Sequence, residues 1–245
     1  MVHVHRPLLA LSSAVLLVAV GTAFVSAQAP KTPTVWDGVY TDAQAERATA
    51  TFSSSCARCH TLAVDGSGNR PLTGDKFWEG YTQKTVGDLL KFVSTNMPNG
   101  AAAGSLSASA YNDLVALILK SNGFPSGTTE VSPETVTNVQ IIPKGGPGEL
   151  PANTLVRMVG CLGPKAGSDW TLTNATDPVR IDKTGSVPED ATRPLGTRTI
   201  ALKFVLTKLD TFAGQRMSVT GILLGAGGAN GLNVSTVNRV AEACP

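Results

Sequence analysis

Histidine is scarce in this sequence, and its scarcity limits the metal chemistry that the chain can support. Of the three histidines, His3 and His5 lie in the first 29 residues, so His60 is the one histidine in the remainder. The four cysteines form two widely separated pairs. Because a structural zinc site gathers about four cysteine, histidine or carboxylate ligands, these counts argue against zinc. They also exclude a metal held between two histidines of a mature chain.

A strong excess of charge is missing too. The chain has 20 Lys plus Arg against 18 Asp plus Glu, with seven against eight in residues 35–125 and ten against seven in 151–245. Nucleic-acid binding needs a strongly basic surface, and the aromatic residues on which bases stack are few in the second of these segments. We therefore expect no nucleic-acid partner.

The first 27 residues have the form of a signal peptide. A basic start at Arg6 precedes an apolar run over 8–25, and Val25, Ser26 and Ala27 supply the small residues of a cleavage site. Cleavage after Ala27 would release the chain into the periplasm. The run is near the minimum length for a membrane span, so an uncleaved anchor is the alternative.

Two domains of different class are expected. The segment 126–151 is rich in Gly, Pro, Ser and Thr, which predicts a linker. Before it the apolar spacing is helical, with helices beginning at Thr41, Thr85 and Ser107 or Ser109. After it the pattern alternates, which predicts a small all-β barrel from five strands. These strands are 154–162, 170–181, 200–208, 216–224 and 232–240.

The sequence Cys56-Ala57-Arg58-Cys59-His60 is a C-x-x-C-H motif. Two thiols at this spacing add to both vinyl groups of haem while the next imidazole reaches the iron. The motif predicts one covalently bound haem c, with His60 as an iron ligand. A disulfide hairpin between the two cysteines is the alternative.

The second axial ligand is predicted to be Met97. The other methionines outside the first residue, Met158 and Met217, lie in strand-like patterns where methionine usually fills a core. Met97 lies instead in a loop between two expected helices, next to Pro98. A five-coordinate haem is the alternative.

Residues 35–125 resemble a class I c-type cytochrome domain, especially the modules that accompany quinoprotein alcohol dehydrogenases. The resemblance implies that Pro71 supplies a carbonyl to His60, that Phe77 and Trp78 line the haem edge, and that Phe52 packs between the first and last helices. Ala48 and Leu117 depart from the family, where glycine and an aromatic residue are common. The matching stretches are GVYTDAQAERATATFSSSCARCH, RPLTGDKFW, KTVGDLLKFVSTNMPNG and YNDLVALILKSNGFP.

Residues 152–245 resemble an OB-like β-barrel domain. This segment contains Cys161 and Cys244, the thiols that remain outside the haem motif. Because an exported protein meets an oxidising compartment, we predict a disulfide between them, with two buried thiols as the alternative.

The function expected from these features is electron transfer. Ligation by His60 and Met97 would close both axial positions, which suits a periplasmic monohaem carrier between a quinoprotein dehydrogenase and a downstream acceptor such as a terminal oxidase. The alternatives are a haem-based sensor or peroxidase-like enzyme, and a partner-docking module with a cytochrome attached. Enzymatic activity is the less favoured of these.

Overall fold

The computed structural model describes residues 1–3, 32–100, 102–165 and 167–244. Apart from its first three residues, the predicted signal peptide lies outside this part. The described chain contains a helical region followed by a β-rich region, each with its own cluster of buried apolar residues. The predicted change of class along the chain is therefore confirmed. None of the helices described has both the length and the apolar character needed to span a bilayer.

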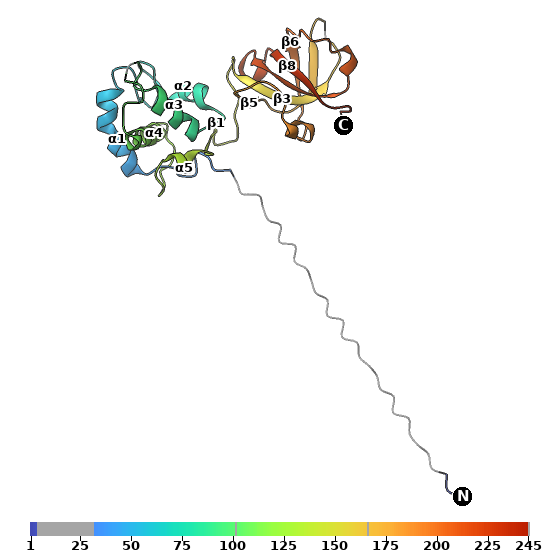
Figure 1. The fold of residues 1–245 in the computed structure, drawn as a ribbon, viewed down its shortest axis with the longest axis horizontal. Helices are drawn as coiled ribbons and strands as arrows, with labels where there is room; N and C mark the ends of the chain where they lie inside the picture. The colour runs from blue at the N-terminus through green and yellow to red at the C-terminus, as the bar shows by residue number, and fades with distance from the viewer. Residues whose placement is uncertain (4–31, 101, 166, 245) are drawn as a thin grey trace. The chain divides into compact units, whose positions relative to one another are not determined.

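The helical region is built mainly from four helices and a shorter fifth one, all labelled in Figure 1. Their inward faces carry apolar residues at helical spacing, which places residues such as Leu89, Leu114 and Leu119 in one core. Ala48 is also buried in this core, so its methyl group is accommodated. The helices are α1 (Asp42–Ser55), α2 (Gly74–Tyr81), α3 (Val86–Asn96), α4 (Ala108–Ser121) and the short α5 (Pro133–Val136).

The three predicted helix starts are confirmed by their capping hydrogen bonds. Thr41 accepts a hydrogen bond from the backbone N–H of Gln44, and Ser107 accepts one from that of Ala110. Thr85 forms a reciprocal capping box with Asp88. Each cap satisfies a backbone donor that the first turn of a helix leaves without a partner.

The segment predicted as a linker, 126–151, is packed against the helical region between residues 131 and 141. Gln44, buried in α1, donates to the carbonyl of Val131 at 3.0 Å and accepts from its N–H at 2.8 Å. Val136 and Ile141 are buried in the helical core, and β2 (Gln140–Ile141) pairs with β1 (Lys84–Thr85). The prediction was wrong here because the segment, although rich in Gly, Pro, Ser and Thr, also contains a few valines and isoleucines that are buried in the core.

Acid is expected to weaken this packing through two exposed carboxylates. The pKa of Asp42 is lowered by hydrogen bonds from Lys120 and Ser126, and the pKa of Glu130 is lowered by Arg47. A carboxyl whose pKa falls on folding stabilises the folded state above its unfolded pKa, and this contribution is lost as the pH falls through the folded value. When the pH is lowered below 4.5, we expect the urea concentration at the unfolding midpoint to decrease. The decrease should be smaller in an Asp42→Asn, Glu130→Gln variant. Equal acid sensitivity in both proteins would contradict this assignment.

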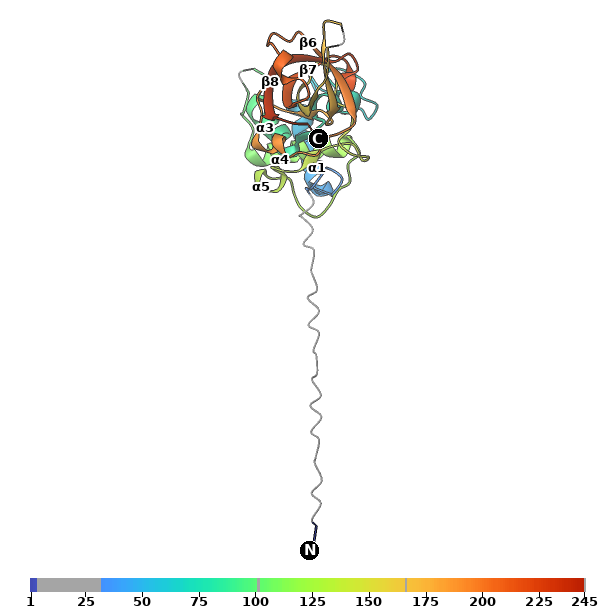
Figure 2. The same ribbon diagram turned by 90° about the vertical axis from the view of Figure 1, so that its right-hand side faces the viewer.

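The β-rich region forms a closed sheet, and its strands curve strongly (Figure 2). Five strands pair in the circular order β3-β4-β6-β8-β7 and back to β3, with β6 and β8 parallel and the other neighbours antiparallel. The short β5 pairs with the first part of β3. The five predicted strand regions are confirmed. The strands are β3 (Leu155–Leu162), β4 (Trp170–Ala175), β5 (Val179–Arg180), β6 (Arg198–Lys203), β7 (Arg216–Leu223) and β8 (Leu232–Ala241).

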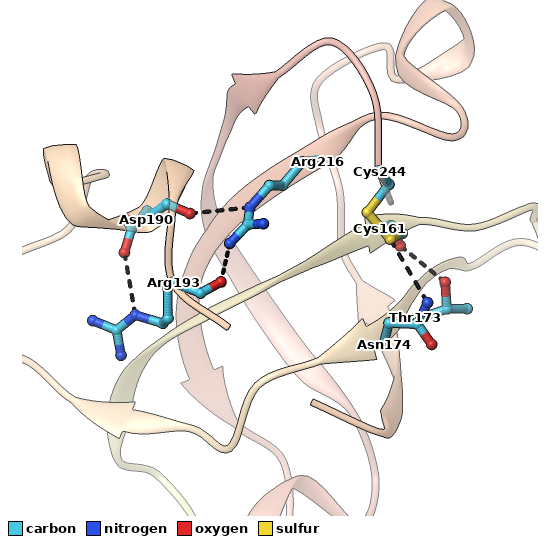
Figure 3. The surroundings of a disulfide bond; sticks show 7 residues. All are labelled: Cys161, Thr173, Asn174, Asp190, Arg193, Arg216 and Cys244. Atoms are coloured by element: carbon cyan, nitrogen blue, oxygen red, sulfur yellow. Dashed lines mark hydrogen bonds and ion pairs between the residues drawn. A yellow bond between two sulfur atoms is a disulfide. The ribbon is translucent and has the colours of Figure 1, made fainter. Parts of the chain in front are cut away.

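A disulfide joins the first strand of this sheet to the end of the chain (Figure 3). It links Cys161 in β3 with Cys244, whose Cα atoms lie 5.6 Å apart. The predicted bridge is therefore confirmed. In the same region a buried carboxylate, Asp190, accepts a hydrogen bond from Ser218 at 2.7 Å and lies near Arg157 and Arg193. These contacts tie the loop that carries Asp190 to the outer face of β3 and β7.

Candidate functional site

A cavity of about 750 Å³ lies within the helical region, between α1, α3, α4 and the segments that connect them. Its walls are mainly apolar, which suits a large planar ligand better than a small polar one. Three of the predicted haem residues come from one turn of the chain, and Met97 comes from another segment. Residues that line the cavity include Phe52, Cys56, Cys59, His60, Pro71, Phe77, Tyr81, Leu89, Phe92, Met97, Tyr111, Leu114 and Ile118.

The C-x-x-C-H motif forms a compact turn at the end of α1. The backbone N–H of Cys56 donates to the carbonyl of Phe52 at 2.8 Å, so the helix runs directly into the motif. The N–H groups of Cys59 and His60 each donate to the carbonyl of Cys56 at 3.0 Å. Both cysteines are free thiols, in contrast with the disulfide-hairpin alternative. The turn brings both sulfurs and the imidazole to the same cavity wall.

The imidazole of His60 is held in one tautomer. Its Nδ1 lies 2.9 Å from the carbonyl oxygen of Arg70. Because a carbonyl only accepts, Nδ1 carries the proton and the lone pair of Nε2 is left for a metal. The predicted partner was the carbonyl of Pro71, so this prediction was wrong by one residue. Arg70 has a φ of 39°, and this left-handed backbone turns its carbonyl, rather than that of Pro71, toward the ring.

Met97 lies at the end of α3, where its side chain lines the cavity. Its backbone carbonyl accepts a hydrogen bond from the hydroxyl of Tyr111 at 2.7 Å. The same hydroxyl accepts from the N–H of Leu106 at 3.2 Å. Tyr111 was not predicted as part of the site. A tyrosine on a buried helix face should have been suspected, because its hydroxyl needs a partner there.

The aromatic wall of the cavity differs from the prediction at one residue. Phe77 and Tyr81 line the cavity, whereas Trp78 is not among the described residues that do. The indole of Trp78 packs edge-on against Phe124, with ring centroids 5.7 Å apart. Phe77 and Tyr81 are four residues apart in α2 and share a helix face, while Trp78 lies on the next face. Burial raises the pKa of Tyr81 to about 12, so its hydroxyl stays neutral.

Every charged side chain among the described residues of the cavity lining is a cation. These are Arg58, Arg70 and Lys76. Such a set complements carboxylates on a ligand that is otherwise apolar.

The family comparison identifies this region. A family model described as cytochrome C oxidase, cbb3-type, subunit III matches residues 43–118. Residues 43–118 form a cytochrome c domain. This cytochrome c domain contains all the cavity residues named above, and its family implies haem c with iron as cofactor. No curated protein and no solved structure matches the chain.

The residues of the cytochrome c domain fit such a group. Cys56 and Cys59 offer two thiols for covalent attachment, and His60 offers a lone pair at Nε2. Met97 offers a thioether sulfur, and the three cations suit the two haem carboxylates. Haem iron supplies a couple that gains or loses a single electron, which makes electron transfer the chemistry that this domain suggests.

Proposed function

We propose that this chain is an exported cytochrome with one haem, bound covalently through Cys56 and Cys59 and ligated by His60 and Met97. The observation that carries the proposal is the single cavity that gathers these four side chains, with the His60 tautomer set by the carbonyl of Arg70. Ligation at both axial positions leaves no iron site for a substrate. The role that follows is transfer of single electrons in the periplasm.

The protein scaffold contributes orientation and exclusion of water. The bond from Nδ1 of His60 to the carbonyl of Arg70 fixes the ring plane and directs Nε2 toward the cavity side on which a metal would bind. Apolar residues such as Leu89 and Leu114 keep water from the cavity walls. A fixed ligand set and a dry pocket let an electron arrive or leave with little rearrangement, which suits a carrier.

Removal of the thioether tests this assignment. Met97→Ala is expected to lower the reduction potential by on the order of 0.1 V or more, because axial ligands set haem potentials over about 0.8 V and thioether ligation favours ferrous iron. The ferrous variant should bind carbon monoxide readily, whereas the unaltered protein should not. Redox titration and the Soret band measure both effects. A wild-type protein that binds carbon monoxide as fast as the variant would overturn the ligand assignment.

The redox partners follow from the same proposal. A quinoprotein dehydrogenase is the proposed donor and a terminal oxidase the proposed acceptor. The match to a domain of an oxidase subunit supports a respiratory setting. Stopped-flow absorbance of the haem, recorded after mixing with each purified candidate, would test this order, because the dehydrogenase should reduce the haem and the oxidase should oxidise it.

We also propose that the β-rich region is an OB-type barrel. Support comes from its five-stranded closed sheet and from the parallel pairing of β6 with β8 that interrupts an otherwise antiparallel order. Trp170 is buried beneath the sheet, so it offers no surface on which a base could stack. Docking to a protein partner is the role that we propose for this barrel.

A further inference from the structure

Among the described residues, the hydroxyl of one side chain, Tyr111, makes the hydrogen bonds that join the loop after Met97 to α4. We propose that Tyr111 is a latch that holds Met97 in place as a ligand and thereby keeps the sixth iron position closed. The inference rests on the proposed function, because it concerns the same methionine. It adds a positioning residue that the haem motif does not disclose.

Tyr111 contacts both ends of the loop with a single hydroxyl. It donates to the carbonyl of Met97 at 2.7 Å and accepts from the N–H of Leu106 at 3.2 Å. The side chain is 3 % exposed, so water does not compete for either bond. A phenol has one donor and can accept at the same oxygen, and both capacities are used here.

The rest of the loop gives little other attachment to the core. Residues 99, 100 and 102–105 are exposed. Three other backbone hydrogen bonds of the described loop residues stay within the loop: Ala103 to Gly100, Gly104 to Met97 and Ser105 to Ala102. The N–H of Met97 donates to the carbonyl of Val93 at 3.1 Å, which joins Met97 to α3. These bonds shape the loop without fixing it against α4. The hydroxyl of Tyr111 therefore connects the backbone of Met97 to helix α4.

The matched comparison for Tyr111→Phe is Tyr40→Phe. The hydroxyl of Tyr40 is also buried, and it donates to the backbone carbonyl of Phe124 at 2.6 Å. Neither residue of that pair lines the cavity. Both variants remove one buried hydroxyl and keep the aromatic ring. They differ in whether the lost bond holds the methionine loop.

The expected result is selective opening of the site. With haem bound, ferrous Tyr111→Phe should bind carbon monoxide about tenfold faster than the wild-type protein, since it loses both hydrogen bonds of the hydroxyl and leaves the N–H of Leu106 without its acceptor. Tyr40→Phe should stay within about twofold of wild type while losing similar stability. Ferric haem with a methionine ligand has a weak absorption band at the red end of the visible spectrum. This band should weaken in Tyr111→Phe and keep its intensity in Tyr40→Phe. Equal carbon monoxide rates in the two variants would overturn the latch.

A measurement on the unaltered protein covers the case in which Tyr111→Phe fails to fold. The amide of Leu106 should exchange with deuterium more slowly than those of Ala103 and Ser105, whose acceptors lie within the loop. Equally fast exchange at all three amides would refute the latch. Failure of the proposed function looks different, because the wild-type protein would then be colourless or would itself bind carbon monoxide at once.

Discussion

A chain with Cys56→Ala and Cys59→Ala is expected to carry no covalent haem when it is produced in a host that assembles c-type cytochromes. Thioether bonds form only from thiol sulfurs, and alanine removes both of them while it keeps the helical turn in which they lie. The intact mass should lack the increment of one haem, and denaturing electrophoresis should show no haem stain. Each single variant should keep one attachment and a weaker stain.

The matched control is the other pair of cysteines. A Cys161→Ser, Cys244→Ser variant removes the same number of sulfurs but should keep full haem content, because these residues form a disulfide in the β-rich region. The two double variants therefore separate the two uses of cysteine in one chain. A haem increment that persists without Cys56 and Cys59, or that vanishes without Cys161 and Cys244, would contradict the assignment.

Local signals in the sequence were sufficient to predict much of the cytochrome c domain. A hydroxyl at Thr41, Thr85 or Ser107 satisfies backbone donors that lie within three residues of it, so such a helix start depends on a few neighbours in the chain. The strands were recognised for a similar reason, since alternation is a property of adjacent residues. The C-x-x-C-H turn is local as well.

The errors came from features that depend on distant residues or on backbone angles. Gln44 forms two hydrogen bonds with the backbone of Val131, which is 87 positions away in the sequence. The composition of the segment around Val131 does not indicate that Gln44 is its partner. The carbonyl given to His60 depends on the left-handed φ of Arg70. An arginine in that conformation is uncommon, and the family resemblance implied the neighbouring Pro71 instead.

The expectation that Trp78 lines the haem edge came from the family resemblance. No helix was predicted over residues 74–81, so the spacing of side chains along it did not enter that expectation. Once Gly74–Tyr81 is known to be helical, the four-residue spacing selects Phe77 and Tyr81 as one face. The same logic reaches Tyr111, which shares the buried face of α4 with Leu114 and Ile118. Periodicity places its ring, but only the structure shows that its hydroxyl meets Met97.

Loss of the disulfide should destabilise the β-rich region by roughly 3 to 5 kcal/mol, because the bridge closes a long loop in the unfolded chain. The two cysteines are 83 positions apart, so the bridge spans nearly the whole of that region. Cys161 lies in β3, the strand that pairs with β7 along its length. Without the bridge, the C-terminal residues after β8 would no longer be linked covalently to β3, and strand pairing and packing alone would hold the sheet closed.

Guanidinium unfolding of the Cys161→Ser, Cys244→Ser variant would measure this effect. In a Trp36→Phe, Trp78→Phe background, the fluorescence of Trp170 reports on the β-rich region, and haem absorbance reports on the cytochrome c domain. Wild-type protein treated with dithiothreitol should behave like the variant, since the reagent reduces a disulfide and leaves thioether bonds intact. Haem absorbance should keep its midpoint in both samples. If the fluorescence midpoint also stayed unchanged, the bridge would contribute no stability, and closure of the sheet would rest on its strand pairing.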